Sequence, residues 1–272
     1  MKFRLVAIDM DGTLLNSQNQ VSDRTRKAIE DASSKGAYIV LATGRILKSA
    51  VNYSEELGLR KPIISCNGAV VVDEEKNILY ERSIKMDTVG TIMRIGEKNN
   101  IYYHLYDKDN FYSNVRDEEV FSLYNSNSSK KKSSQIDVSI FNKIEDIVNK
   151  KDLNIYKFIF IDDDRSKLDS LRNRLGEIEG ISVCSSWSNN IEVVEREVSK
   201  GNSLRMLCDK LNIPREEVIA IGDNENDMSM IEYAGLGVAM GNGVDMVKKS
   251  ADMVTSTNDE DGVAQIIEKY IL

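Results

Sequence analysis

Short apolar runs alternate with amphipathic segments over the first 82 residues of the chain. Continuous apolar stretches at 3–8, 37–42 and 62–66 are typical of parallel strands that are covered on both faces. The segments between them have helical periodicity, and the first begins at Ser22, a good N-cap, and ends before Gly36. Strands that alternate with helices of this length predict βαβ units and a parallel sheet.

The middle of the chain has a different pattern. From about 83 to 192 the strand candidates are half-buried or mixed, and residues 125–135 form a polar, lysine-containing run that we interpret as a solvated loop. The alternation then returns, with a buried strand at 217–222 and an amphipathic helix at the end of the chain. We therefore predict an α/β fold: a doubly wound, Rossmann-like parallel-sheet core from residues 1–82 and 193–272, with an α+β cap domain inserted at 83–192.

Composition and charge narrow the function classes. The 272 residues are 41% hydrophobic and 29% charged, and 36 basic residues against 44 acidic residues give a net charge of −8. This balance disfavours a nucleic-acid partner, because binding to a phosphate backbone needs a basic surface. The sequence contains no apolar run of membrane-spanning length and no signal-peptide pattern, and its three cysteines lack a CxxC pair. We therefore expect a cytoplasmic protein that binds neither nucleic acid nor membrane.

Polar residues follow each predicted core strand at its carboxyl end, where open α/β sheets bind ligands. These residues are Asp9, Asp11, Gly12 and Thr13; Thr43, Gly44 and Arg45; Asn67 and Gly68; and Asp223, Asn224, Asn226 and Asp227. Lys200 stands at a predicted helix start and could project into the same crevice. Carboxylates, amides, a hydroxyl and a lysine together suit a Mg²⁺ ion that is shared with a phosphate group.

The two carboxylates of Asp9 and Asp11 point the same way if the chain is extended there. Burying them together is costly unless a cation lies between them or a reaction uses them. Asp9 and Asp223, with a main-chain carbonyl near Asp11, could hold Mg²⁺, while Lys200 and the N–H groups of the Gly12 turn neutralise a phosphate. One aspartate could then attack phosphorus while the other transfers protons.

Four segments of the chain carry a resemblance to a known family. "DMDGTLL", "LATGR", "VSKGNSL" and "AIGDNENDMSMIEYAG" resemble, in order and spacing, the four signatures of the haloacid dehalogenase-like phosphohydrolases. The long insertion between the second and third signatures, together with "SCNGA", resembles the Cof-type branch. Members of that branch are mostly cytoplasmic, Mg²⁺-dependent phosphatases of sugar phosphates and related small metabolites.

The resemblance implies a role for each matching residue. Asp9 is expected to be the nucleophile and Asp11 the general acid and base, and the Asp11 main-chain carbonyl is expected to bind Mg²⁺ with Asp9 and Asp223. The implied phosphate contacts are the Met10 main chain, Thr43, Gly44, Lys200 and Asn226, with Asp227 holding Lys200 in place. Arg45 and Asn67 are further candidates for substrate binding, and either could instead only shape a strand end.

The cap offers no comparable match, so the resemblance implies nothing about which substrate is chosen. Tyr103, Tyr106 and Trp187 are candidates that the sequence cannot rank. His104 is the only histidine, and we interpret it as a packed or surface residue rather than a catalytic one.

We therefore predict a Mg²⁺-dependent hydrolase of small phosphate monoesters that forms an aspartyl phosphate and is a monomer or weak homodimer. One alternative is a phosphotransferase such as a phosphomutase, which needs the same Asp9 but returns the phosphoryl group to a sugar. A second alternative is a non-catalytic binder of phosphorylated metabolites. Such a binder would be expected to lack Asp9 or Asp11, and both are present.

Overall fold

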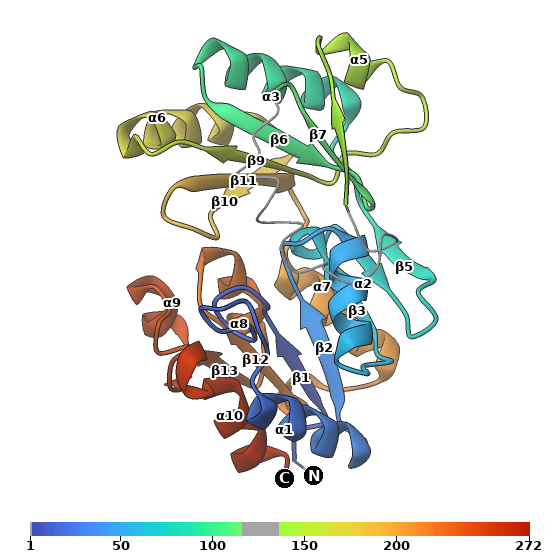
Figure 1. The fold of residues 1–272 in the computed structure, drawn as a ribbon, viewed down its shortest axis with the longest axis vertical. Coiled ribbons are helices and arrows are strands. Elements are labelled where there is room, and N and C mark those ends of the chain that lie inside the picture. The colour runs from blue at the N-terminus through green and yellow to red at the C-terminus, as the bar shows by residue number, and fades with distance from the viewer. Residues whose placement is uncertain (1, 116–135) are drawn as a thin grey trace.

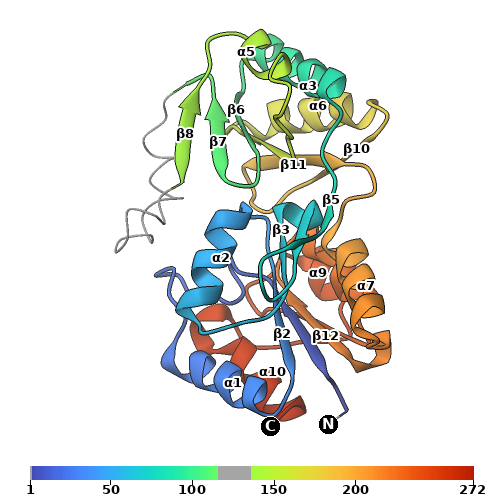
Figure 2. The ribbon, with the colours of Figure 1, turned by 90° about the vertical axis from the view of Figure 1, so that its right-hand side faces the viewer.

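The computed structural model describes residues 2–115 and 136–272, and it contains two β-sheets, one above the other along the long axis of the molecule (Figure 1). The lower sheet in this view has eight strands and the upper sheet has six. Figure 2, turned by 90°, shows the six-stranded sheet between the eight-stranded body and a layer of helices. The lysine-containing run at 125–135 lies outside the described residues.

The eight-stranded sheet is parallel over most of its width. In spatial order its strands are β14 (Met253–Val254), β13 (Leu236–Ala239), β12 (Val218–Gly222), β1 (Leu5–Ile8), β2 (Tyr38–Ala42), β3 (Ile63–Ser65), β4 (Val70–Val72) and β5 (Ile78–Glu81). The strands from β14 to β3 pair in parallel, and β3, β4 and β5 form an antiparallel extension. The strand order reverses beside β1, because β2 and β12 flank it on opposite sides. The predicted doubly wound core is therefore confirmed, and its ligand-binding edge lies at the carboxyl ends of β1 and β12.

Helices cover both faces of this sheet (Figure 1). They are α1 (Asp23–Ser34), α2 (Leu47–Glu56), α7 (Lys200–Leu211), α8 (Met228–Tyr233), α9 (Asp245–Ser250) and α10 (Gly262–Tyr270), with 3-10 turns at Cys66–Gly68, Arg215–Glu217, Glu225–Asp227 and Asn258–Glu260. α1 begins where the sequence predicts, because the Ser22 hydroxyl accepts a hydrogen bond from the N–H of Thr25. Ile8 of β1 packs with α1 and α10, whereas its neighbour Ala7 packs with α7, so β1 is buried on both faces.

The six-stranded sheet is covered by helices on the side away from the eight-stranded sheet (Figures 1 and 2). Its strands, in spatial order, are β10 (Ile181–Cys184), β11 (Asn190–Glu195), β9 (Lys157–Ile161), β6 (Tyr102–Tyr106), β7 (Asn110–Ser113) and β8 (Asp137–Ile140). The covering helices are α3 (Met86–Lys98), α5 (Glu145–Val148) and α6 (Arg165–Gly176). Because one face of the sheet packs on these helices, its other face is left to meet the eight-stranded sheet.

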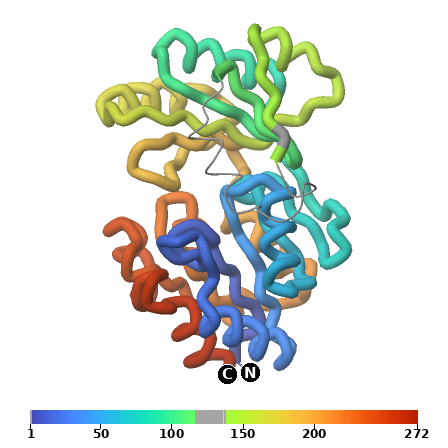
Figure 3. The backbone as a smooth tube through the Cα atoms, in the orientation of Figure 1, coloured from blue at the N-terminus to red at the C-terminus, as the bar shows by residue number. Residues whose placement is uncertain are grey.

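The eight-stranded sheet is built from both ends of the chain, as Figure 3 shows by the blue and red parts of the tube. Residues 5–81 and 218–254 supply its strands, and residues 102–195 supply those of the six-stranded sheet. The domain boundaries at 82/83 and 192/193 stay a prediction, and β11 of the six-stranded sheet continues past 192 to Glu195. In the described part of the chain, each helix is too short or too polar to cross a membrane.

Candidate active site

Asp9 and Asp223 meet at the carboxyl ends of β1 and β12, which are adjacent parallel strands. Both residues are nearly buried, with 5% and 9% of their surfaces exposed. Thr13 supports Asp223, because its hydroxyl donates to Asp223 Oδ1 at 2.8 Å. Gly12 has φ of +81°, and a Cβ at this position would lie 2.6 Å from Asp223 Oδ2. The turn after β1 therefore needs glycine both for its conformation and for the close approach of the second carboxylate.

Lys200 lies between two carboxylates at the first residue of α7. Its side chain is fully buried, and Nζ lies 2.5 Å from Asp9 Oδ1 and 2.5 Å from Asp227 Oδ1. Gly201 lets α7 approach α8 closely, since a Cβ there would lie 2.1 Å from the main-chain oxygen of Ser229. These two ion pairs raise the pKa of Lys200 despite the opposing effect of its burial. Lys200 is therefore a charged lysine that faces the Asp9 carboxylate from within the protein.

Asp227 joins Lys200 to the loop that follows β12. Asp227 Oδ2 accepts the main-chain N–H groups of Asp223 and Asn224 at 3.0 and 3.1 Å, while its other oxygen accepts from Lys200. Asp227 is fully buried, so these contacts are shielded from water. Asp227 therefore fixes the position of the Lys200 ammonium and of the start of the loop after β12.

Asp9, Asp223 and Asp227 form an acidic cluster whose ligand atoms lie within 4.8 Å of one another. Burial, and then the charge of Asp227, raises the pKa of Asp9 well above its usual value and that of Asp223 to about 7, although Lys200 opposes both shifts. Buried carboxylates that repel one another fit a hard cation with oxygen ligands such as Mg²⁺. The structure adds Asp227 to the metal-binding candidates Asp9, Asp11 and Asp223, but both Asp227 oxygens already have hydrogen-bond donors.

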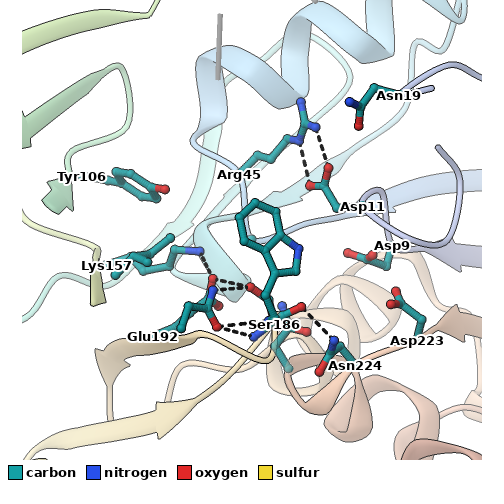
Figure 4. A pocket seen from close by; sticks show the side chains of 15 residues that line it. Asp9, Asp11, Asn19, Arg45, Tyr106, Lys157, Ser186, Glu192, Asp223 and Asn224 are labelled. Carbon is teal, nitrogen blue, oxygen red and sulfur yellow. Dashed lines mark hydrogen bonds and ion pairs between the residues drawn. The ribbon is translucent and has the colours of Figure 1, made fainter. Parts of the chain in front are cut away.

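The Asp11 carboxylate pairs with Arg45, as Figure 4 shows. Arg45 Nε and Nη2 donate to its two oxygens at 2.8 and 2.5 Å, and the guanidinium lies 4.8 Å from the centre of the Tyr53 ring. Burial disfavours the Asp11 anion, but the charge and hydrogen bonds of Arg45 outweigh it and lower the Asp11 pKa. In this structure Asp11 is an ionised partner of Arg45, so Arg45 contacts the predicted acid and base directly.

The loop after β2 faces two side-chain amides. A Cβ on Gly44 would lie 2.8 Å from Asn67 Oδ1 and 3.6 Å from Asn226 Nδ2, and Asn226 Nδ2 donates to Asn67 Oδ1 at 3.2 Å. Thr43, beside Gly44, is fully buried. The Met10 side chain packs in the apolar core, so Met10 can meet a ligand only through its main chain. The structure therefore brings the predicted phosphate contacts of three separate strand ends together.

The opposite wall of the pocket belongs to the six-stranded sheet (Figure 4). Lys157 of β9 and Glu192 of β11 form an ion pair at 2.8 Å in which only 2% of each side chain is exposed. The Ser186 hydroxyl donates to the same Glu192 oxygen at 2.8 Å. Sequence reasoning missed Lys157 and Glu192, and the available signal was a charged residue within each of two apolar strand patterns.

The structure ranks the aromatic candidates of the cap. Tyr103 packs against Phe160 in the cluster under the helices, so it is not part of the pocket wall. Tyr106 and Trp187 both line the pocket, and 41% of Trp187 is exposed. His104, predicted to be a packed or surface residue, is fully buried among aromatic rings and is therefore packed.

Comparison with known proteins identifies relatives along the whole chain. The model of a family described as haloacid dehalogenase-like hydrolase matches residues 6–267. Phosphatase YwpJ of Bacillus subtilis (strain 168) is 33% identical over 99% of this chain and 100% of its own length. The 5-amino-6-(5-phospho-D-ribitylamino)uracil phosphatase YcsE of the same organism is 34% identical over 99% of this chain and 96% of its own. A solved structure of a haloacid dehalogenase-like hydrolase from B. subtilis matches with a TM-score of 0.89 and 34% identity, covering 99% of this chain and 100% of the other.

Proposed function

Because this chain belongs to the haloacid dehalogenase-like hydrolases and is a phosphatase, we propose that it hydrolyses small phosphate monoesters through a phosphorylated Asp9. The observation that carries the proposal is the placement of the Asp9 carboxylate. It is nearly buried, it lines the pocket, and its Oδ1 is held 2.5 Å from the Lys200 ammonium. Burying a carboxylate costs the fold stability, so its presence here indicates a chemical role. Its fixed position suits it to attack phosphorus.

In the first step, an Asp9 oxygen attacks the phosphorus atom of the bound ester. A bond forms between that oxygen and phosphorus, and the bond between phosphorus and the ester oxygen breaks. The departing oxygen takes a proton from Asp11, and the product alcohol leaves. Lys200 keeps its positive charge throughout and stabilises the negative charge that develops on the transferring group.

In the second step, water loses a proton to Asp11 and attacks the phosphorus atom of the aspartyl phosphate. The bond between phosphorus and the Asp9 oxygen breaks, which restores the Asp9 carboxylate and releases inorganic phosphate. The ion pair between Asp11 and Arg45 bears on both steps, because Asp11 must be protonated before it can act as an acid. An anionic substrate that draws the guanidinium away from Asp11 would favour that protonation.

The residues that we propose to hold Mg²⁺ are Asp9 and Asp223, with the main-chain carbonyl of Asp11. When bound, the ion supplies positive charge that reduces the repulsion between these carboxylates and a phosphate dianion. Thr13 keeps Asp223 oriented toward the cluster by its hydrogen bond. Asn226, Gly44 and the other predicted phosphate contacts would bind the remaining oxygens of the phosphate.

We propose sugar phosphates and related polyol phosphates as substrates. Trp187 offers an exposed aromatic surface at the pocket, and its main-chain N–H donates to Asn190 Oδ1 at 3.1 Å, which fixes the loop that carries it. An aromatic ring beside hydrogen-bonding groups suits the alternating C–H and O–H groups of a sugar. The relative YcsE is named for 5-amino-6-(5-phospho-D-ribitylamino)uracil, in which an amino group joins a phosphorylated ribityl chain to a uracil ring, so that compound belongs in the test set.

Phosphate release tests this proposal directly. The purified protein is assayed with hexose and pentose phosphates, 5-amino-6-(5-phospho-D-ribitylamino)uracil and p-nitrophenyl phosphate, each with Mg²⁺ and with a chelator. We expect Mg²⁺-dependent release that Asp9→Asn abolishes. Absence of release from every ester would contradict hydrolysis, and phosphoryl transfer to a second sugar would support the phosphotransferase alternative. The cytoplasmic location, the monomer or weak dimer, and the absence of nucleic-acid and membrane partners stay predictions.

A further inference from the structure

A buried ion pair from the six-stranded sheet reaches the phosphate end of the pocket. Lys157 is the first residue of β9 and Glu192 lies within β11, and the residues beside them in these strands are apolar. Almost none of either side chain is exposed. Two charges buried in this way are a weak source of stability compared with apolar residues of the same size. We therefore infer that this ion pair serves a purpose other than folding.

Glu192 also contacts the turn that follows β3 of the eight-stranded sheet. Its Oε2 accepts a hydrogen bond from Asn67 Nδ2 at 2.5 Å, and its Oε1 accepts from Lys157. Asn67 lies in the turn after β3 and has φ of +58°, a left-handed conformation that asparagine tolerates better than most residues. The side-chain oxygen Oδ1 of Asn67 in turn accepts a hydrogen bond from Asn226 Nδ2. Glu192 therefore orients the Asn67 side-chain amide so that its Oδ1 faces Asn226.

Lys157 also lies close to the loop after β2. Its Nζ lies 3.0 Å from the position that a Cβ on Gly44 would occupy. It also lies 5.3 Å from the centre of the Tyr106 ring, which packs beside it. The space in front of Gly44 is thus bordered by Asn67, Lys157 and Asn226, and one of these three comes from the six-stranded sheet.

We propose that Glu192 is a positioning residue that fixes Asn67 and Lys157 around Gly44, so that the six-stranded sheet supplies part of the phosphate-binding site. Lys157 then contributes a positive charge to the space in front of Gly44, in addition to the charge of Lys200 beside Asp9. This inference rests on the proposed function, because it assigns the space in front of Gly44 to the phosphate group.

The test compares variants by their inhibition with inorganic phosphate, using p-nitrophenyl phosphate as the reporter substrate. Glu192→Gln removes the charge that orients both partners. Asn67→Gly removes the amide while keeping a residue that adopts positive φ, so it avoids backbone strain and leaves the Lys157–Glu192 pair intact. Arg172→Gln is the matched control, because Arg172 on α6 also joins the cap to the core, through Glu225 in the turn after β12 at 2.7 Å, without contacting Asn67.

We expect Glu192→Gln and Asn67→Gly each to raise the inhibition constant of phosphate and the KM by about tenfold or more, with a smaller fall in kcat. The double variant should be little worse than either single variant, because the two residues act through one another. Arg172→Gln should leave phosphate inhibition unchanged. The proposal is overturned if folded Asn67→Gly binds phosphate as the parent does, or if Arg172→Gln weakens binding equally. A parent protein without phosphatase activity would instead contradict the proposed function.

Discussion

Replacing Lys200 with methionine tests how much of the site depends on one buried cation. The variant keeps the length of the side chain and removes the charge that lies 2.5 Å from both Asp9 Oδ1 and Asp227 Oδ1. A hydrogen bond to a charged group contributes about 1.5–3 kcal/mol, and removing one partner of a buried ion pair costs about 3–5 kcal/mol. We therefore expect the free energy of unfolding to fall by about 3–5 kcal/mol at neutral pH. Urea unfolding in the presence of a chelator measures this loss without interference from metal ions.

Phosphate release should fall further in this variant than the loss of stability alone explains. Removing one preorganised group that stabilises developing charge lowers kcat by about 10²–10³-fold in other enzymes, and we expect a similar loss here. Lys210→Met is the matched control, because Lys210 is an exposed lysine on the same helix and its loss should change stability by less than about 0.5 kcal/mol. If Lys200→Met has the same free energy of unfolding and the same kcat as Lys210→Met, the assigned electrostatic role of Lys200 is wrong.

Three further predictions concern other contacts. Gly201→Ala places a Cβ 2.1 Å from the Ser229 oxygen, so urea unfolding should show a loss of about 1–3 kcal/mol, and an unchanged midpoint would contradict this packing. Lys157→Met alone should cost about 3–5 kcal/mol in the same assay, whereas the double variant Lys157→Met/Glu192→Met should cost much less. Burial raises the Glu192 pKa, but Lys157 outweighs it and holds the pKa below 4.5, so the stabilisation is present above that pH and is lost as pH falls through the lowered pKa. Between about pH 6 and pH 4, the free energy of unfolding should therefore fall less in the double variant than in the parent protein. Equal falls in the two proteins would contradict a lowered Glu192 pKa.

The sequence was a good guide to the core sheet and to the residues at its edge. Apolar runs at 3–8, 37–42 and 62–66 each contain the strand that the structure has there. Parallel strands share one carboxyl edge, so the residues that come directly after each strand are also neighbours in space. That is why Asp9 and Asp223, more than 200 positions apart, could be placed together in advance.

The wall from the six-stranded sheet could not be predicted in the same way. Lys157 and Glu192 lie on neighbouring antiparallel strands, and their pairing depends on strand order and on which face meets the core sheet. Tyr103 and Tyr106 illustrate the same difficulty, because residues three apart in a strand point to opposite faces. The contact of Asp11 with Arg45 depends in turn on the spacing of two neighbouring strands and the rotamers of both side chains. These pairings arise from tertiary packing, so a local pattern can indicate a buried charge, as at Lys157 and Glu192, but cannot identify its partner.

The proposed mechanism depends above all on a covalent bond between Asp9 and phosphorus. This bond can be detected by intact-protein mass spectrometry after acid quenching during turnover of the best ester from the panel, followed by peptide mapping. We expect a fraction of the protein to have gained one phosphoryl group, carried by the peptide that contains Asp9 and absent from Asp9→Asn. A phosphoryl group mapped to another residue, or undiminished turnover by Asp9→Asn, would show that Asp9 is not the nucleophile.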